Sequence, residues 1–182
     1  MLIKSKNNTK KATFSFRPDF IATSVTTIDF EYLISLGVST CFVDLDGTVV
    51  SRGTFEVDKQ LAHALKNSGL DIKIATNRPR SRSLKELKND LSASGVIHPQ
   101  GIFGKPSKKY LRSALKEYGL KPHEVVMIGD RFIQDILGAN RSSVYSLLVY
   151  KLGSSHGKVD SLLSKFEHRM TIKFEQSYSK ID

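Results

Sequence analysis

Short apolar segments alternate with helical segments from residue 40 onward, and this alternation constrains the fold more than any other feature. The apolar segments lie at residues 41–43, 72–75, 96–97, 125–128 and 144–149. Leucine and alanine recur at helical spacing between them, around residues 61–65, 84–91 and 111–118. Buried strands that alternate with helices are typical of a parallel sheet covered on both faces. We therefore expect an α/β, three-layer Rossmann-like fold with a five-stranded parallel sheet.

The composition is that of a folded domain. Hydrophobic residues make up 40% of the 182 residues and charged residues 25%, which excludes wholesale disorder. The single cysteine, Cys41, excludes a disulfide framework and a cysteine-rich zinc site. The longest apolar stretch, near residues 144–150, is too short to cross a bilayer. The first residues lack an apolar run behind their charges, so we expect no secretory signal and a cytoplasmic location.

Positive charge dominates, with 28 Lys and Arg against 18 Asp and Glu and a formal net charge of +10. Residues 1–12 contain lysines and no acid, which predicts a basic flexible arm. Residues 13–182 are expected to form a single domain, with short helical pieces from residues 14–33 covering one edge. Apolar residues from Leu162 to Phe174 recur at helical spacing between basic ones and predict a C-terminal helical extension. That helix suits either an anionic bilayer or docking on the sheet.

Polar residues that could take part in catalysis or binding follow the apolar segments. In parallel sheets the reactive groups gather there, just beyond the carboxyl ends of the strands. The polar residues are Asp44, Asp46, Thr76, Asn77, Lys105, Asp130 and Asp135. The two aspartates after the first segment can reach one site if the chain turns sharply, and Gly47 permits that turn. One carboxylate of such a pair can attack while the other moves protons.

The remaining residue types suit a phosphoryl group and a cation. Asp130 and Asp135 supply the oxygen ligands that Mg²⁺ prefers, and clustered carboxylates without a cation would repel one another. Thr76 offers a hydroxyl and Lys105 a compact positive charge, which both suit a phosphate. Each residue alone has an ordinary structural explanation; Asp135, for example, would suit a helix start without any metal. Their occurrence together favours a catalytic site.

Four groups of residues in this order over residues 38–150 resemble the four motifs of the haloacid dehalogenase (HAD) superfamily of aspartyl phosphotransferases. The groups are Asp44 with Asp46, Thr76, Lys105, and Asp130 with Asp135. The resemblance implies that Asp44 is the nucleophile and that Asp46 protonates the leaving group and then activates water. It also implies that Thr76, Asn77 and Lys105 hold the phosphoryl oxygens. The implied Mg²⁺ ligands are Asp44, the backbone carbonyl of Asp46, Asp130, and Asp135 directly or through water.

The segments between the motifs are too short for a cap domain. Residues 48–72 and 76–105 each have room for one helix and little else, so we expect an open site. An open site suits a phosphorylated substrate too large to enclose, such as a protein, a nucleic acid end or a lipid headgroup. Among capless HAD proteins the chain resembles subfamily IIIA. Residues 129–141, with 17–20 and 28–33, resemble its phosphatidylglycerophosphate phosphatase branch.

The leading interpretation is a Mg²⁺-dependent phosphatase that converts phosphatidylglycerophosphate to phosphatidylglycerol. Basic residues after Thr76 and Lys105 are expected around the site and suit an anionic lipid at the inner face of a membrane or in an organelle. They would also suit nucleic acid, but the aromatic residues do not form the pattern of a stacking platform. The alternatives are a phosphatase for nucleotides or nucleic acid ends, and a catalytically idle basic binding module.

Overall fold

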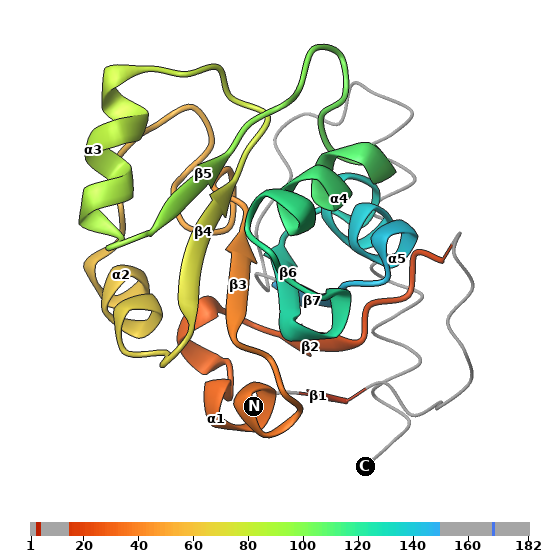
Figure 1. Ribbon diagram of the computed structural model, residues 1–182. Helices are drawn as coiled ribbons and strands as arrows, with labels where there is room; N and C mark the ends of the chain where they lie inside the picture. The colour runs from red at the N-terminus through yellow and green to blue at the C-terminus, as the bar shows by residue number, and fades with distance from the viewer. Residues whose placement is uncertain (1–2, 5–14, 150–168, 170–182) are drawn as a thin grey trace.

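A seven-stranded sheet forms the middle layer of the computed structural model, which describes residues 3–4, 15–149 and 169 (Figure 1). The strand order is β1-β2-β7-β6-β3-β4-β5. All neighbours are parallel except β1, which runs antiparallel to β2. The strands are β1 (Ile3–Lys4), β2 (Phe20–Ala22), β3 (Thr40–Val43), β4 (Asp71–Ala75), β5 (Gly95–Ile97), β6 (Val125–Gly129) and β7 (Tyr145–Val149).

Helices cover both faces of the sheet. The α-helices are α1 (Phe30–Ser35), α2 (Lys59–Lys66), α3 (Arg82–Asp90), α4 (Lys108–Glu117) and α5 (Gly138–Ser142). A π-helix, Phe132–Leu137, runs directly into α5, and 3₁₀ turns lie at Val25–Thr27 and Pro122–Glu124. Side-chain oxygens of Asp58, Ser81 and Ser107 cap the N-termini of α2, α3 and α4, which fixes where these helices start.

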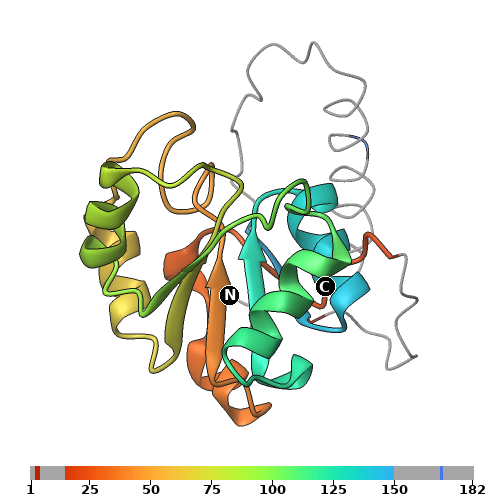
Figure 2. The same ribbon diagram turned by 45° about the horizontal axis from the view of Figure 1, so that its top comes forward.

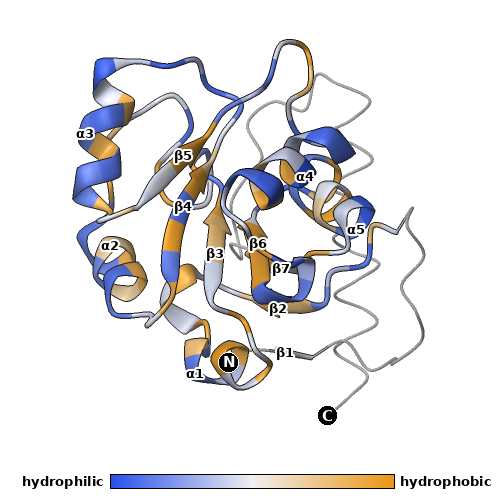
Figure 3. Cartoon of the chain, in the orientation of Figure 1, coloured by the Kyte–Doolittle hydropathy of each residue, from blue (hydrophilic) through white to orange (hydrophobic). Residues whose placement is uncertain are grey.

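Side chains that point alternately to the two faces of the sheet pack into two hydrophobic cores. In β3, Cys41 and Val43 face the layer that contains Leu65 of α2 and Leu84 of α3. Phe42, between them in sequence, faces the layer that contains Leu111 of α4. Successive side chains of a strand point to opposite faces, so a strand that is apolar throughout is buried on both sides. In Figure 3 the strands of the middle layer are mostly hydrophobic, and the helices that cover them are hydrophilic on their outer faces. The predicted three-layer α/β fold is confirmed.

The strands that follow β3 in the sequence lie on both sides of it in the sheet. It runs from β3 to β4 and β5, and then crosses to β6 and β7 on the opposite side of β3. The carboxyl ends of β3 and β6 therefore diverge into different connections, and ligands of open α/β sheets bind at such a switch point.

One part of the predicted topology was wrong. The five predicted strands are present as β3 to β7, but Phe20–Ala22, predicted as part of a helical piece, is a sixth parallel strand. It pairs with Leu147–Val149 and so satisfies the edge of β7. Asp19 reinforces the pairing, because its carboxylate accepts hydrogen bonds from the backbone and the hydroxyl of Ser146. The helical prediction is confirmed further along, where Phe30–Ser35 forms α1.

No cap domain interrupts the segment from Asp44 to Lys105, all of which the structure describes. Residues 47–58 form a short flap that is held by single bridges between Asp46 and Val50 and between Val50 and Val57. None of the described helices is long and apolar enough to span a membrane. Of the predicted basic arm, residues 3–4 form β1. The rest of the arm and the predicted C-terminal extension, except Arg169, lie outside the described residues.

Candidate active site

The loops at the carboxyl ends of the strands carry the polar residues singled out in the sequence. Asp44 follows β3, Thr76 follows β4 and Asp130 follows β6. Figure 2, turned so that this end of the sheet comes forward, shows how the loops gather there. The expected site is therefore assembled at the switch point, and it divides into a buried part and a more exposed part.

A buried lysine bridges two carboxylates at the centre of the site. The ammonium group of Lys105 donates to Asp44 Oδ1 and, at 2.8 Å, to Asp135 Oδ1. The second oxygen of Asp135 accepts the backbone N–H of Arg131 at 3.1 Å. The side chain of Lys105 is 2% exposed and that of Asp135 is fully buried. A buried arrangement of this kind is held together only while the opposite charges stay paired.

Two glycines make this close packing possible. Gly47 has φ +86°, and a Cβ atom there would overlap the carboxylate of Asp130. A Cβ atom on Gly129 would overlap the carboxyl group of Asp135. The turn that the sequence predicts at Gly47 is thus confirmed, and both glycines let carboxylates approach the backbone closely.

Asp130 completes a cluster of three carboxylates. Single oxygens of Asp44, Asp130 and Asp135 all lie within 4.8 Å of one another. Asp130 Oδ2 accepts from the guanidinium group of Arg52 at 2.7 Å. Asp130 Oδ1 is buried and has no hydrogen-bond partner among the described residues. A buried acceptor left unpaired is costly, so this oxygen is a candidate ligand for a cation.

Burial and mutual repulsion shift the acidities of the cluster. Burial, followed by the charge of Asp135, raises the pKa of Asp44 from 3.8 to about 6 although Lys105 opposes the shift. Burial likewise raises the pKa values of Asp130 and Asp135. For Lys105, burial alone would lower the pKa, but the charges of Asp135 and Asp44 outweigh it and raise the pKa. The lysine is therefore charged, and the carboxylates carry excess negative charge that a cation would relieve.

Asp46 lies in the more exposed part and has a different partner. Its two oxygens accept hydrogen bonds from Arg78, from Nε at 2.9 Å and from a terminal nitrogen at 2.5 Å. The other terminal nitrogen of Arg78 donates to the backbone carbonyl of Thr54 in the flap at 2.7 Å. The guanidinium group also lies 4.5 Å from the centre of the Phe55 ring. Hydrogen bonding to Arg78 holds the pKa of Asp46 below its usual value. Arg78 thus ties Asp46 to the flap.

The remaining predicted residues lie beside the cluster. Thr76 is fully buried, and its hydroxyl oxygen accepts the backbone N–H of Arg78 at 3.0 Å. Asn77 uses its side-chain amide to accept from the backbone N–H of Lys105 at 2.9 Å and to donate to the carbonyl of Lys105 at 3.2 Å. In this structure Asn77 therefore positions the loop of Lys105. The predicted contacts of Thr76 and Asn77 with a phosphate stay predictions.

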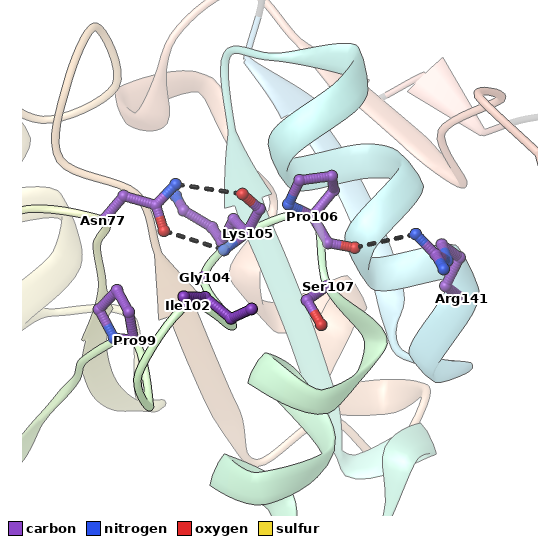
Figure 4. A pocket seen from close by; sticks show the side chains of 8 residues that line it. All are labelled: Asn77, Pro99, Ile102, Gly104, Lys105, Pro106, Ser107 and Arg141. Carbon is purple, nitrogen blue, oxygen red and sulfur yellow. Dashed lines mark hydrogen bonds between the residues drawn. The ribbon is translucent and has the colours of Figure 1, made fainter.

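A cavity of about 540 Å³ opens next to Lys105 (Figure 4). Its lining residues are Asn77, Pro99, Ile102, Gly104, Lys105, Pro106, Ser107 and Arg141. Figure 4 shows the paired hydrogen bonds between Asn77 and Lys105 at one side of the cavity and Arg141 at the other. The cavity and the carboxylate cluster share Lys105, so a ligand in the cavity would adjoin the site.

Comparisons with known proteins agree with this geometry. The model of the family described as HAD-hydrolase-like matches residues 102–168, a segment that includes Lys105, Asp130 and Asp135. The protein named "Probable phosphatase YqeG" of Bacillus subtilis is 27% identical over 158 residues, which cover 85% of this chain and 89% of that protein. Over residues 102–168 the chain is thus similar to the HAD-hydrolase-like family, and over most of its length it is similar to a protein named as a probable phosphatase.

A second group of relatives matches only locally. The bovine protein named "Phospholysine phosphohistidine inorganic pyrophosphate phosphatase" is 44% identical over 48 residues. The match covers 26% of this chain and 18% of that protein, so the similarity concerns one segment of each.

Solved structures support the fold. An uncharacterized protein from Listeria monocytogenes superposes with a TM-score of 0.54 and 15% identity, covering 74% of this chain and 98% of that one. One from Corynebacterium glutamicum gives 0.53 and 20%, covering 63% and 87%. At such identities the agreement concerns the fold alone.

Sequence reasoning missed the roles of two arginines. Arg78 was expected to flank the site, but nothing in the pattern indicated that it would pair with Asp46. Arg52, in the flap, contacts Asp130 although the two residues are far apart in sequence. The signal available for Arg78 was its place directly after Thr76 and Asn77, at the end of a strand beside β3.

Proposed function

We propose that the chain is a Mg²⁺-dependent phosphatase that hydrolyses a phosphomonoester, with phosphatidylglycerophosphate as its substrate. A phosphatase of the HAD type is the function that the family and the relatives support. The observation that carries the proposal is Lys105, which is buried between Asp44 and Asp135 at an open switch point. A lysine in that place neutralises the nucleophile in the resting site and stands where a phosphoryl group would need a positive charge.

The residues present fit a magnesium ion. Asp44, Asp130 and Asp135 offer oxygens within 4.8 Å of one another, and Asp130 Oδ1 lacks a partner among the described residues. Hard divalent cations prefer such carboxylate oxygens. When bound, the ion would supply positive charge that stabilises the phosphoryl oxygens.

The side chains of the chain divide the chemistry between them. In the proposed reaction a carboxylate oxygen of Asp44 attacks phosphorus, the bond from phosphorus to the leaving oxygen breaks, and an aspartyl phosphate forms on Asp44. Lys105 keeps Asp44 in place and ionised near neutral pH, which the nucleophile requires. Asp46 gives a proton to the leaving oxygen and later takes one from a water molecule. The oxygen of that water attacks phosphorus, the bond from phosphorus to Asp44 breaks, and inorganic phosphate leaves. Because Asp46 is paired with Arg78, proton donation requires that pair to open.

The open architecture supports a large substrate. Between Asp44 and Lys105, where every residue is described, the site has only the short flap beside it. Basic side chains follow Thr76 and Lys105, and the net charge is +10. An anionic lipid headgroup presented at a surface fits an unenclosed, positively charged site. We therefore favour phosphatidylglycerophosphate over a small soluble metabolite.

A phosphate-release assay tests the proposal. Purified protein with Mg²⁺ should release phosphate from phosphatidylglycerophosphate in detergent micelles, and release should stop when a chelator removes the metal. Asp44→Asn should abolish release while leaving the melting temperature close to that of the wild type or above it. Ser35→Ala, at an exposed position on α1 at the opposite end of the sheet, serves as the control that retains activity.

The substrate panel separates the alternatives. It should include nucleoside 5′-monophosphates, 5′-phosphorylated oligonucleotides, phosphohistidine and phospholysine, the last two because of the shared 48-residue segment. Equal or faster turnover of any of these would contradict the lipid assignment and keep the phosphatase. Absence of release from every substrate, with the fold intact, would contradict the phosphatase and favour a binding module.

A further inference from the structure

Exposed apolar side chains are distributed unevenly over the molecule. Among the described residues the large hydrophobic side chains that are exposed are Ile34, Phe55, Ile102 and Phe103. Ile34 belongs to α1, which Figure 1 shows at the end of the sheet where β3 begins. The other three lie on loops at the opposite end, where the strands finish beside the active site. Isolated exposed hydrophobic residues are ordinary, but their concentration at the catalytic end calls for an explanation.

The loop of residues 98–104 carries the most exposed of them. Ile102 is 92% exposed and Phe103 38% exposed, and they follow one another in the loop between β5 and α4. Lys109 on the first turn of α4 places its ammonium group 4.1 Å from the centre of the Phe103 ring. The loop therefore presents an apolar tip with a cation directly behind it. Ile102 is one of the residues that line the cavity next to Lys105 (Figure 4).

Two segments at this end contain cations and no acid. Residues 98–112 include Lys108, Lys109 and Arg112 in addition to the buried Lys105, and contain neither Asp nor Glu. Residues 77–85 include three arginines and a lysine and are likewise free of acids. Both segments begin at the carboxyl end of the sheet, after β4 and after β5. An anionic surface facing this end would meet the cations on α4 that follow the apolar tip.

We propose that the surface formed by Ile102, Phe103, Lys108, Lys109 and Arg112, here called the docking surface, binds an anionic lipid bilayer. Ile102 enters the boundary between headgroups and acyl chains, and the cations contact the anionic headgroups. This inference deepens the proposed function and rests on it for the identity of the substrate. Docking in this way turns the mouth of the cavity next to Lys105 toward the membrane, so that a phosphorylated headgroup reaches the site without leaving the bilayer.

A lipid surface explains the docking surface better than a protein partner does. A stable protein interface buries about 800 Å² on each partner around a packed apolar centre. Here the apolar part is one loop tip, and the rest is the positive charge of Lys108, Lys109 and Arg112 on α4. Weak insertion combined with several headgroup contacts is the way such a surface binds a membrane, because each cation near the surface adds a modest increment.

A vesicle-binding experiment tests the proposal without any turnover. The full chain is mixed with vesicles of phosphatidylcholine and phosphatidylglycerol, or of phosphatidylcholine alone, and binding is measured by flotation. We expect binding to the anionic vesicles, weakened by salt. Ile102→Asp should lower the affinity by about tenfold or more, since it removes the apolar tip and adds a repelled charge. Ile34→Asp, at the opposite end of the sheet, is the matched control and should bind like the wild type.

The electrostatic part has its own pair of variants. Lys108→Ala combined with Lys109→Ala should weaken binding by about fivefold for each cation removed. Lys66→Ala combined with Lys116→Ala removes the same charge from the ends of α2 and α4, away from the docking surface, and should have a smaller effect. Melting temperatures of all variants show whether each is folded.

The outcomes separate docking from catalysis. Equal binding of the wild type and Ile102→Asp, equal binding to neutral vesicles, or no binding at all would overturn the docking surface, and the last would leave the surface to a protein partner. Hydrolysis of micellar phosphatidylglycerophosphate without vesicle binding would overturn docking and leave the proposed function standing. Vesicle binding that depends on Ile102, without phosphate release from any substrate, would support docking and overturn the phosphatase.

Discussion

Asp44 and Asp46 are separated by one residue and have opposite environments. The side chain of Asp44 is 8% exposed and shares Lys105 with Asp135, whereas that of Asp46 is 35% exposed and pairs with Arg78. The pKa of Asp44 is raised, chiefly by burial, and that of Asp46 is lowered, chiefly by hydrogen bonds from Arg78. One sharp turn at the end of β3 thus places two identical side chains in different electrostatic settings.

The difference teaches how one short motif can supply two roles. Asp44 belongs to an inner half of the site, which also contains Lys105, Asp130 and Asp135 and is held by buried strands. Asp46 belongs to an outer half, which contains Arg78 and the flap of residues 47–58. Two carboxyl groups whose surroundings push their pKa values apart are suited to different steps.

Replacing Lys105, the lysine at the centre of the inner half, should cause the largest loss of unfolding free energy. Lys105→Met leaves the carboxylates of Asp44 and Asp135 buried without their shared cation, which costs about 3–5 kcal/mol of unfolding free energy. Lys73→Met is the matched control, because Lys73 is also buried in the sheet but pairs with Asp71, whose side chain is 44% exposed and can turn to water. Urea unfolding of both variants measures the difference. Equal losses would contradict the division into halves.

Neutralising the two aspartates should change stability in opposite directions. In metal-free protein at neutral pH, Asp44→Asn should raise the unfolding free energy by about 1–3 kcal/mol, because it removes repulsion with Asp135 and leaves Lys105 one acidic partner. Asp46→Asn should lower it by about 1 kcal/mol or less, since the partly exposed pair with Arg78 is weakened by solvent. Chemical denaturation in the presence of a chelator measures both values.

The pH dependence follows from the same shifts. The pKa of Asp44 in the folded protein is raised to about 6. As pH rises from about 4 to about 6, the unfolded chain loses the proton of Asp44 more readily than the folded protein does, so the unfolding free energy falls. The folded pKa of Asp46 is lowered, so its favourable contribution is present above the usual aspartate range and is lost as pH falls through it. Asp44→Asn should remove the first trend and Asp46→Asn the second, as measured by denaturation from about pH 2 to about pH 7.

Breaking the pair of Arg78 with Asp46 in the outer half should reduce phosphate release without abolishing it. Arg78→Met frees Asp46 and the flap, and we expect about a tenfold loss of phosphate release, because general acid–base catalysis depends on the position of the group. The limb of the pH–rate profile governed by Asp46 should move to higher pH. Arg82→Met, whose side chain is 92% exposed and pairs with Glu86, should leave both unchanged. An unshifted profile for Arg78→Met would contradict the role assigned to Arg78.

The smallest effect is expected at Arg52, which joins the flap to the inner half. Its side chain is half exposed, so Arg52→Ala should cost less than about 1 kcal/mol. The substitution also frees Asp130 Oδ2 and should tighten Mg²⁺ binding by a few fold, which calorimetry would measure. Weaker Mg²⁺ binding would show that Asp130 needs Arg52 to hold its position.

The sequence was informative about the inner half for a physical reason. Apolar strands from Cys41 to Val43 and from Val125 to Ile128 are read directly from local composition, and Asp44 and Asp130 follow them at one edge. The three-residue strand β2 could not be predicted, because its strand character depends on pairing with Leu147–Val149 far along the chain. Asn77 shows the same limit, since its hydrogen bonds to Lys105 depend on how two loops meet.

The outer half was less predictable than the inner half. Its geometry depends on the single side chain of Arg78, which could have pointed to solvent as an ordinary surface arginine. It pairs instead with Asp46 because the flap brings the carbonyl of Thr54 within reach of the same guanidinium group. Long polar side chains have many conformations of similar energy, and local sequence does not choose among them.

Acid-quenched labelling of the protein tests the division of roles most directly. The protein is mixed with p-nitrophenyl phosphate and Mg²⁺, quenched in acid during turnover, and weighed intact by mass spectrometry. The account predicts one added phosphoryl group on Asp46→Asn, which can form the aspartyl phosphate with this good leaving group but cannot activate water, and none on Asp44→Asn. A phosphoryl group retained on Asp44→Asn, or absent from Asp46→Asn under conditions where the wild type turns over, would contradict it.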